Sequence, residues 1–166
     1  MASTSVSVRN MTRRVTPRFP YAKVAEAILP HWDISLVFVG PTEAKELNMK
    51  LRRKYYVPNV LSYELGNRSG EVIICLAEAK AQASSYGLSY THFTLYLFIH
   101  ALIHLKGHPH GPTMERMERA LLAQFVPASK KHLNETTHRN RYRHRHAPDE
   151  SRGGGRGARR QGGRKS

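Results

Sequence analysis

The sequence predicts a folded domain of the α+β class, followed by a basic tail. Two runs of β-branched and apolar residues, 34–39 and 71–76, are typical of buried strands. Stretches with apolar residues at helical spacing lie before, between and after them. A chain of 166 residues is also long enough to bury a proper core. We therefore expect one domain at residues 1–128 and a separate tail at residues 129–166.

The first part of the chain is expected to contain two strands and two helices. Alternating polar and apolar residues predict a short strand at Ser5–Arg9. A helix is expected within residues 17–30, where apolar residues recur at roughly helical spacing. The strand Ile34–Val39 is ended by a Gly-Pro pair, and a helix follows at Thr42–Arg53, with an acidic residue in its first turn.

The second part continues with two strands joined by a turn, and then with three helices. The first of these strands alternates, as a half-buried strand should, and the second is apolar throughout. A turn rich in Gly and Asn separates them. The expected elements are strands at Val60–Leu65 and Glu71–Leu76 and helices at Ala77–Tyr86, Tyr90–Lys106 and Thr113–Phe125.

A histidine motif near the end of the second of these three helices predicts a metal site. His100 and His104 stand four residues apart, so both imidazoles lie on one helical face. Gly107 ends the helix and Pro109 prevents it from resuming, so the chain turns back and His110 can join the pair. Three imidazoles with an open fourth position form a catalytic kind of zinc site. We therefore expect one zinc ion per chain, held by His100, His104 and His110.

Other interpretations of these histidines remain open. They can be core histidines, although two imidazoles on one turn of an apolar helix are costly to bury without partners. His108 also competes with His110 as the third ligand. A zinc peptidase would carry H-E-x-x-H, in which the glutamate is the general base. Here Ala101 occupies that position and no carboxylate lies between His100 and His110, which argues against peptidase chemistry.

The charge of the chain favours a polyanionic partner. The formal net charge is +15. From Ser129 onward twelve Lys and Arg residues stand against three acidic residues, so nine of these charges lie in the tail and six in the domain. The tail has too few apolar residues to fold and is expected to be disordered, and Arg/Gly-rich segments of this kind bind RNA. Nucleic acid is therefore the expected partner, and a merely solubilising tail is the alternative.

The composition also favours a cytoplasmic protein that does not span a membrane. No apolar run has the length of a membrane span, and no secretory signal is visible. The single cysteine, Cys75, excludes an internal disulfide and fits a reducing compartment. Because Cys75 stands in an apolar run, we expect a buried side chain and not a zinc ligand.

Three blocks of sequence together resemble a known family. The third block is the most specific, with the pattern H-x3-H-L-x-G-x-x-H. In their order and spacing the blocks resemble the YbeY family of bacterial rRNA maturation factors, which are zinc-dependent endoribonucleases. The resemblance covers roughly residues 20 to 125, and the blocks are Leu47–Tyr63, Gly70–Cys75 and His100–His110.

This resemblance implies a fold, a site and an activity. The implied fold is α+β, a small mixed sheet with helices packed on it, and the expected string of strands and helices agrees with it. The resemblance implies that His100, His104 and His110 hold zinc at a catalytic centre. Arg52 falls on the family's characteristic arginine, which implies a catalytic or phosphate-binding role. The implied activity is cleavage of single-stranded RNA in 16S rRNA maturation, with the ribosomal subunit as partner.

The third block departs from the family pattern H-G-x-L-H-L-x-G-Y-D-H at four positions. Ala101, Ile103, His108 and Pro109 stand where the family has Gly, Leu, Tyr and Asp. A carboxylate often orients a ligand imidazole, so Pro109 removes a partner that the third histidine would otherwise have. An RNA-binding factor in which zinc is structural or absent is therefore the alternative to a nuclease.

Overall fold

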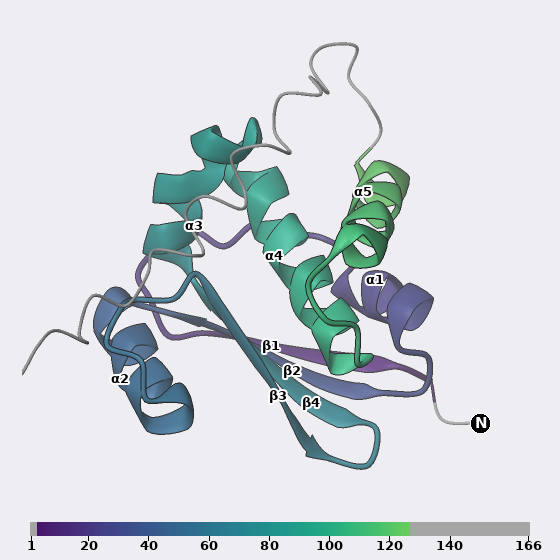
Figure 1. Cartoon of the computed structure of the whole chain (residues 1–166), viewed down its shortest axis with the longest axis horizontal. Coiled ribbons are helices and arrows are strands. Elements are labelled where there is room, and N and C mark those ends of the chain that lie inside the picture. The colour runs from purple at the N-terminus through teal and green to yellow at the C-terminus, as the bar shows by residue number, and fades with distance from the viewer. Residues whose placement is uncertain (1–2, 127–166) are drawn as a thin grey trace, which may run out of the picture. The chain divides into compact units, whose positions relative to one another are not determined.

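Four strands form one mixed sheet in the computed structural model, which describes residues 3–126 (Figure 1). They are β1 (Ser5–Asn10), β2 (Asp33–Val39), β3 (Val60–Gly66) and β4 (Ser69–Cys75), in the spatial order β1-β2-β4-β3. β1, β2 and β4 are parallel, whereas β3 is antiparallel to β4. The expected α+β fold with a small mixed sheet is confirmed. The predicted tail lies outside the described residues.

The sheet has an apolar core on each of its two faces. Leu36 of β2 pairs with Val72 of β4, and both side chains are buried in the larger core. Val37 and Ile73 also pair, but their side chains belong to a smaller core on the opposite face. Successive side chains of a strand point to opposite faces, so each apolar run serves both cores. Cys75, at the end of β4, is buried in the smaller core as expected.

The helices are divided unequally between the two faces. α2 (Pro41–Arg52) packs on the smaller core and lies at the lower left in Figure 1. The other helices lie above the sheet in that view and enclose the larger core. None of the helices among residues 3–126 is both long enough and apolar enough to cross a membrane. The helices of the upper layer are α1 (Tyr21–Ile28), α3 (Leu76–Gln82), α4 (Tyr90–Leu105) and α5 (Pro112–Phe125).

α4 is the central helix of the larger core. Most of its residues are apolar and buried, and it packs against α1, α3, α5 and the sheet. The side chain of Ser89 caps its first turn by accepting the backbone N–H of His92 at 3.1 Å. At the other end, Leu105 packs on Gly70 of β4, where a Cβ would lie only 2.8 Å from Leu105 Cδ1. The absence of a side chain at Gly70 therefore lets the end of α4 approach the sheet closely.

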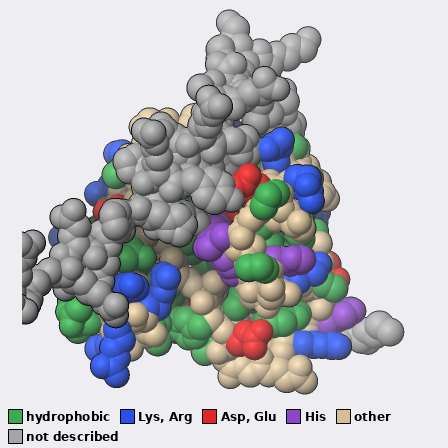
Figure 2. All heavy atoms as spheres, viewed as in Figure 1, with side chains coloured by type: hydrophobic (Ala, Val, Ile, Leu, Met, Phe, Trp, Pro, Cys, Tyr) green, Lys and Arg blue, Asp and Glu red, His purple; other side chains and the backbone are tan. Residues whose placement is uncertain are grey.

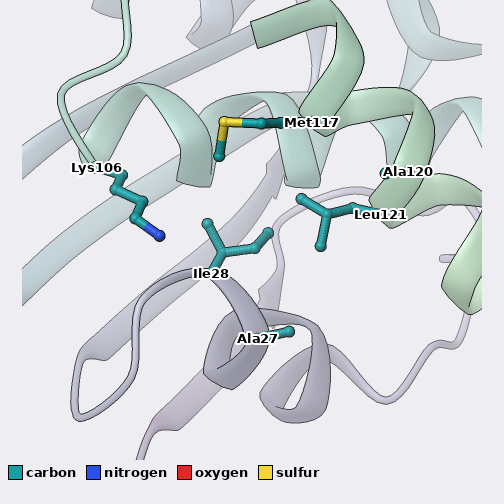
Figure 3. A pocket seen from close by; sticks show the side chains of 6 residues that line it. All are labelled: Ala27, Ile28, Lys106, Met117, Ala120 and Leu121. Carbon is teal, nitrogen blue, oxygen red and sulfur yellow. The ribbon is translucent and has the colours of Figure 1, made fainter. Parts of the chain in front are cut away.

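A hollow opens between α1 and α5, close to the end of α4 (Figure 3). Its volume is about 180 Å³. The lining is apolar apart from one amino group, so the hollow lacks the convergent polar groups of a ligand site. The lining residues are Ala27, Ile28, Lys106, Met117, Ala120 and Leu121.

The predicted elements are all present, with shifts at their ends. The helix expected to reach Tyr86 is α-helical only to Gln82 and continues as the short 3₁₀-helix η1 (Ala83–Tyr86). The strand expected to reach Leu76 ends one residue earlier, because Leu76 already begins α3. α2 ends at Arg52 because Arg53 adopts a left-handed conformation, with φ of 57°, and closes the helix.

Candidate metal centre

Three imidazoles meet at the C-terminal end of α4. One ring nitrogen from each of His100, His104 and His110 lies within 4.8 Å of the others. The ring centroids are 4.6 Å apart for His100 and His104, 4.3 Å for His104 and His110, and 5.2 Å for His100 and His110. The first two residues come from one helical turn and the third from the loop before α5. Imidazoles at these separations converge on a point that one ion would fill.

The loop after α4 reverses the chain in the way that the sequence predicts. Gly107 has φ of 93°, which favours glycine, and its N–H donates to the carbonyl of His104 at 2.9 Å. The N–H of His108 then donates to the carbonyl of Ile103 at 3.2 Å. These bonds satisfy the last carbonyls of α4 and direct the following residues back along the helix. His110 therefore meets the two helical histidines.

The ring of His104 is held in one orientation by the same loop. Its Nδ1 donates to the backbone carbonyl of His108 at 3.0 Å. A carbonyl oxygen only accepts, so the proton of the neutral ring lies on Nδ1 and Nε2 keeps its lone pair. The pKa of His104 is lowered to about 4, chiefly by burial and then by charge repulsion from His100 and His110. The ring is therefore neutral near pH 7, which is the form that binds a metal.

His100 has a carboxylate partner from a different helix. Its Nδ1 lies 2.6 Å from Oε1 of Glu118, which is only 4% exposed on α5. The hydroxyl of Tyr96 donates to the other oxygen, Oε2, at 3.1 Å. An ionised carboxylate accepts the Nδ1 proton and so leaves Nε2 of His100 for a metal. His100 therefore has a carboxylate partner, although no carboxylate directly precedes His110.

The sequence motif does not identify Glu118, because this residue lies beyond the histidine block. A signal was nevertheless present. Glu118 stands four residues after Met114 and three before Leu121, on the apolar stripe of the last helix. A lone carboxylate on a stripe that faces the core is costly to bury unless it has a partner. Together with two buried imidazoles nearby in the sequence, this position suggests a carboxylate–imidazole pair.

The structure places His110, and not His108, with the other two imidazoles. His108 contributes its backbone carbonyl to His104, and its ring does not belong to the cluster.

Arg52 is the last residue of α2, on the opposite face of the sheet from α4, and its side chain is exposed. Its guanidinium forms no hydrogen bond or ion pair with any residue of the described part. A role for Arg52 in binding phosphate therefore stays a prediction.

The donor atoms of the cluster fit a divalent metal ion. Two of the three rings have their Nδ1 protons bound to oxygen, so each presents Nε2. A ligand imidazole that donates its other N–H to a carboxylate or a carbonyl is the usual arrangement in protein zinc sites. Three neutral imidazoles keep the full positive charge on the ion and leave one position open. This donor set is suited to polarising an anionic substrate or activating water.

Comparison with known proteins shows the family to which the chain belongs. The chain matches the family profile described as "Endoribonuclease YbeY" over residues 2–126. The Thiobacillus denitrificans protein of that name is 33% identical in an alignment 112 positions long, which covers 61% of this chain and 76% of the relative. The Campylobacter jejuni protein is 36% identical in an alignment 101 positions long, which covers 56% of this chain and 75% of the relative.

A solved structure supports the fold independently. The solution structure of TM1509 from Thermotoga maritima aligns with a TM-score of 0.56 and 18% identity, over 73% of this chain and 89% of the other. At this identity the likeness concerns the fold alone. The family profile, by contrast, extends over every described element from β1 to α5. The chain belongs to the YbeY family.

Proposed function

We propose that this protein is a metal-dependent endoribonuclease that cleaves single-stranded RNA. The observation that carries the proposal is the cluster of His100, His104 and His110, with two rings oriented to present Nε2. The curated relatives bear the name endoribonuclease, which indicates RNA as the substrate. Zinc is the proposed ion, because three imidazoles with an open position suit it.

The residues of this chain prepare the site in two ways. His100, His104 and His110 supply the ligands, while Glu118 and the carbonyl of His108 hold two Nδ1 protons in place. When bound, such an ion lowers the pKa of a coordinated water to about 7 and attracts phosphate oxygens. The His100 ring is buried and the His104 ring is half-buried, which keeps these two donors fixed before substrate arrives.

Arg52 is the proposed phosphate ligand. A planar guanidinium can bind two oxygens of one phosphate at once, which an ammonium group cannot. Arg52 is exposed, and its guanidinium is not engaged by a carboxylate of residues 3–126, so it is accessible to RNA. The resemblance in the block from Leu47 to Tyr63 is the reason to choose it among several neighbouring cations.

The proposed cellular role is maturation of ribosomal RNA in the cytoplasm. The support is the resemblance of the three sequence blocks to rRNA maturation factors, together with the net charge of +15. A basic chain is attracted to the negatively charged surface of a ribosomal subunit. A single-stranded segment is the proposed target, because a strand must bend to bring one phosphate to the histidines and a duplex resists this bend.

The test compares the wild-type protein, His104→Ala and Arg52→Lys on single-stranded RNA, duplex RNA and a casein-type peptide substrate. We expect the wild-type protein to cleave the single-stranded RNA, and we expect cleavage to stop when a chelator removes the metal. Arg52→Lys should keep its metal and fold but lose most of the rate, about 100-fold or more. Arg9→Lys, on the far edge strand β1, is the matched control and should cleave normally.

Two results would contradict the proposal. Peptide cleavage without RNA cleavage would identify a zinc peptidase, despite Ala101 at the position of the general base. RNA binding without cleavage by the metal-loaded protein would identify a binding factor in which zinc is structural. Elemental analysis of each sample ensures that the metal is present when activity is measured.

A further inference from the structure

The exposed aromatic residues of the described chain gather in one short segment. Tyr55 is 75% exposed and Tyr56 is 53% exposed, although large aromatic side chains usually bury most of their surface. Met49 and Leu51, at the end of α2, are also exposed, at 40% and 50%. Residues 49–56 are called the basic-aromatic segment below. Exposed apolar side chains that cluster in this way mark an interaction site.

The same segment is strongly cationic. It contains four Lys and Arg residues, and no acidic residue lies between Glu46 and Glu64. The cationic side chains are exposed, and none of them forms an ion pair or hydrogen bond with another residue of the described part. Their charge is therefore available to a partner. The four cations are Lys50, Arg52, Arg53 and Lys54.

The segment is exposed in its middle but fixed at both ends. Asn48 is fully buried, and its side-chain amide donates to the carbonyl of Tyr56 at 2.9 Å. The N–H of Arg53 donates to the carbonyl of Met49 at 3.0 Å, and that of Lys54 to the carbonyl of Asn48 at 3.4 Å. After the tyrosines, Val57 packs against the smaller core. The backbone that carries both rings is thus ordered before a partner arrives, which lowers the entropic cost of binding.

Aromatic rings interleaved with cations fit unpaired RNA. Bases stack on exposed rings whatever their sequence, and Lys or Arg side chains neutralise the phosphates between them. A duplex buries the faces of its bases, so it offers nothing for the tyrosines to stack on. An anionic membrane would also attract cations and aromatic side chains. RNA is favoured here because the segment contains Arg52, and because Lys, Arg and histidine side chains are visible from the same side of the molecule in Figure 2.

The position of the segment suits a strand that continues to the metal centre. Figure 2 shows Lys, Arg and hydrophobic side chains side by side over α2, at the lower left, and histidine side chains near the middle of the view. Three residues after the segment the chain enters β3, one of the two edge strands of the sheet. α2 and α4 lie on opposite faces, so a bound strand would cross this edge to join the two surfaces.

We propose that the basic-aromatic segment is a stacking platform for unpaired RNA bases. Tyr55 and Tyr56 each stack on a base, and Lys50, Arg53 and Lys54 contact the flanking phosphates. The inference rests on the proposed endoribonuclease function, since it adds a second contact with the same RNA. The platform holds the strand on one side of Arg52 while the metal centre acts on it further along.

Binding of labelled oligonucleotides to the full-length chain, with a chelator present to prevent cleavage, tests the proposal. The probes are an oligouridylate, an abasic strand of equal length and charge, and a duplex of equal length. The variants are Tyr55→Ala/Tyr56→Ala and Tyr55→Phe/Tyr56→Phe. Val8→Ala/Val15→Ala removes two exposed apolar side chains elsewhere and is the control. Thermal unfolding of each variant shows whether its fold is intact.

Wild type should bind the oligouridylate more tightly than the abasic strand or the duplex. The alanine pair should lose about tenfold in affinity per tyrosine for the oligouridylate and little for the abasic strand. The phenylalanine pair, which keeps both rings, should bind like wild type. Because the tail is present in every variant, its charge contributes equally to all of them.

Three outcomes would overturn the platform. The first is equal binding of the abasic strand and the oligouridylate by wild type, and the second is unchanged binding by the alanine pair. In the third, the alanine pair binds RNA as wild type does but no longer binds anionic phosphatidylserine vesicles, which would mean that the segment contacts a membrane surface. If wild type cleaves RNA in any of these cases, the platform fails and the nuclease function stands. If the wild-type protein neither binds nor cleaves RNA, both the platform and the nuclease function are contradicted.

Discussion

At the scale of single residues, the bond between Glu118 and His100 makes metal affinity depend on α5. Glu118→Gln keeps the shape of the side chain but removes the charge that holds the Nδ1 proton. We expect zinc affinity to fall about 10- to 100-fold, as is usual when such a carboxylate is lost. Competition with a chromophoric chelator measures the change directly.

Glu64→Gln removes a carboxylate of equal charge from the exposed part of β3 and serves as the control. If both variants bind zinc as wild type does, Glu118 does not support the metal centre. Tyr96→Phe should have a smaller effect of the same sign, because it removes only one hydrogen bond to the carboxylate.

We expect substitutions of His108 and His110 to have different effects on the zinc content of the protein. His110→Ala removes a ring from the cluster, so the purified protein should lose most of its zinc. His108→Ala should keep about one zinc per chain, because its contribution is a backbone carbonyl that alanine also has. Elemental analysis of both variants separates them, and the reverse pattern would move the third ligand to His108.

The histidines were predictable from the sequence because their arrangement is local. A spacing of four on a helix followed by a glycine stop brings His100, His104 and His110 together without knowledge of the rest of the fold. Glu118 belongs to the next helix, and only the packing of α5 against α4 brings it to His100. For Arg52 the sequence supplied a family resemblance but did not indicate where its side chain lies relative to the histidines. Its role therefore stays a prediction, which the proposed assay tests.

At the scale of elements, the contact of α4 with β4 depends on Gly70. In Gly70→Ala the new Cβ would lie 2.8 Å from Leu105 Cδ1, so the end of α4 must shift. Because Leu105 is buried against the strand, we expect a loss of about 1–3 kcal/mol in the free energy of unfolding. Equilibrium unfolding in urea measures this loss.

Gly40→Ala provides the matched comparison. There the new Cβ would lie 2.8 Å from Oε2 of Glu43, a flexible and exposed side chain that can turn away. This variant should unfold at nearly the same urea concentration as wild type. Equal stability losses in the two variants would show that Gly70 has no special role in the packing of α4.

The elements themselves were visible in the sequence, but their arrangement was not. Apolar runs and helical periodicity located every strand and helix to within a few residues. The parallel pairing of β1 with β2, and of β2 with β4, joins segments that are distant in the sequence. No local pattern specifies such a pairing, and the mixed sheet was expected only from the family resemblance. The early end of α3 at Gln82 was also missed, since a 3₁₀-helix and an α-helix share similar residue preferences.

At the scale of the whole molecule, the tail from Ser129 supplies most of the positive charge but lies outside the described residues. Truncation after Ala128 removes nine of the fifteen net positive charges. We expect weaker RNA binding and a flatter dependence of affinity on salt, because fewer counterions are released. Zinc content should not change, since the cluster lies entirely within the described domain.

Titration of RNA binding over a range of salt concentrations checks this prediction. An unchanged slope after truncation would show that the tail does not contact RNA. The truncated protein should retain the preference of the stacking platform for an oligouridylate over an abasic strand, because that preference depends on residues 49–56.

The hydrogen bond between His100 and Glu118 has a further consequence for the backbone of α5. A cation on Nε2 of His100 makes Nδ1–H a stronger donor, and the bond to the buried carboxylate is strengthened. Opening of α5 away from α4 would then require this bond to break beside a loaded metal centre. Metal loading should therefore slow the exchange of α5 amide hydrogens with solvent deuterium, while those of α2 exchange as before. The occupancy of the metal centre is thereby measurable at a helix that supplies none of the ligands.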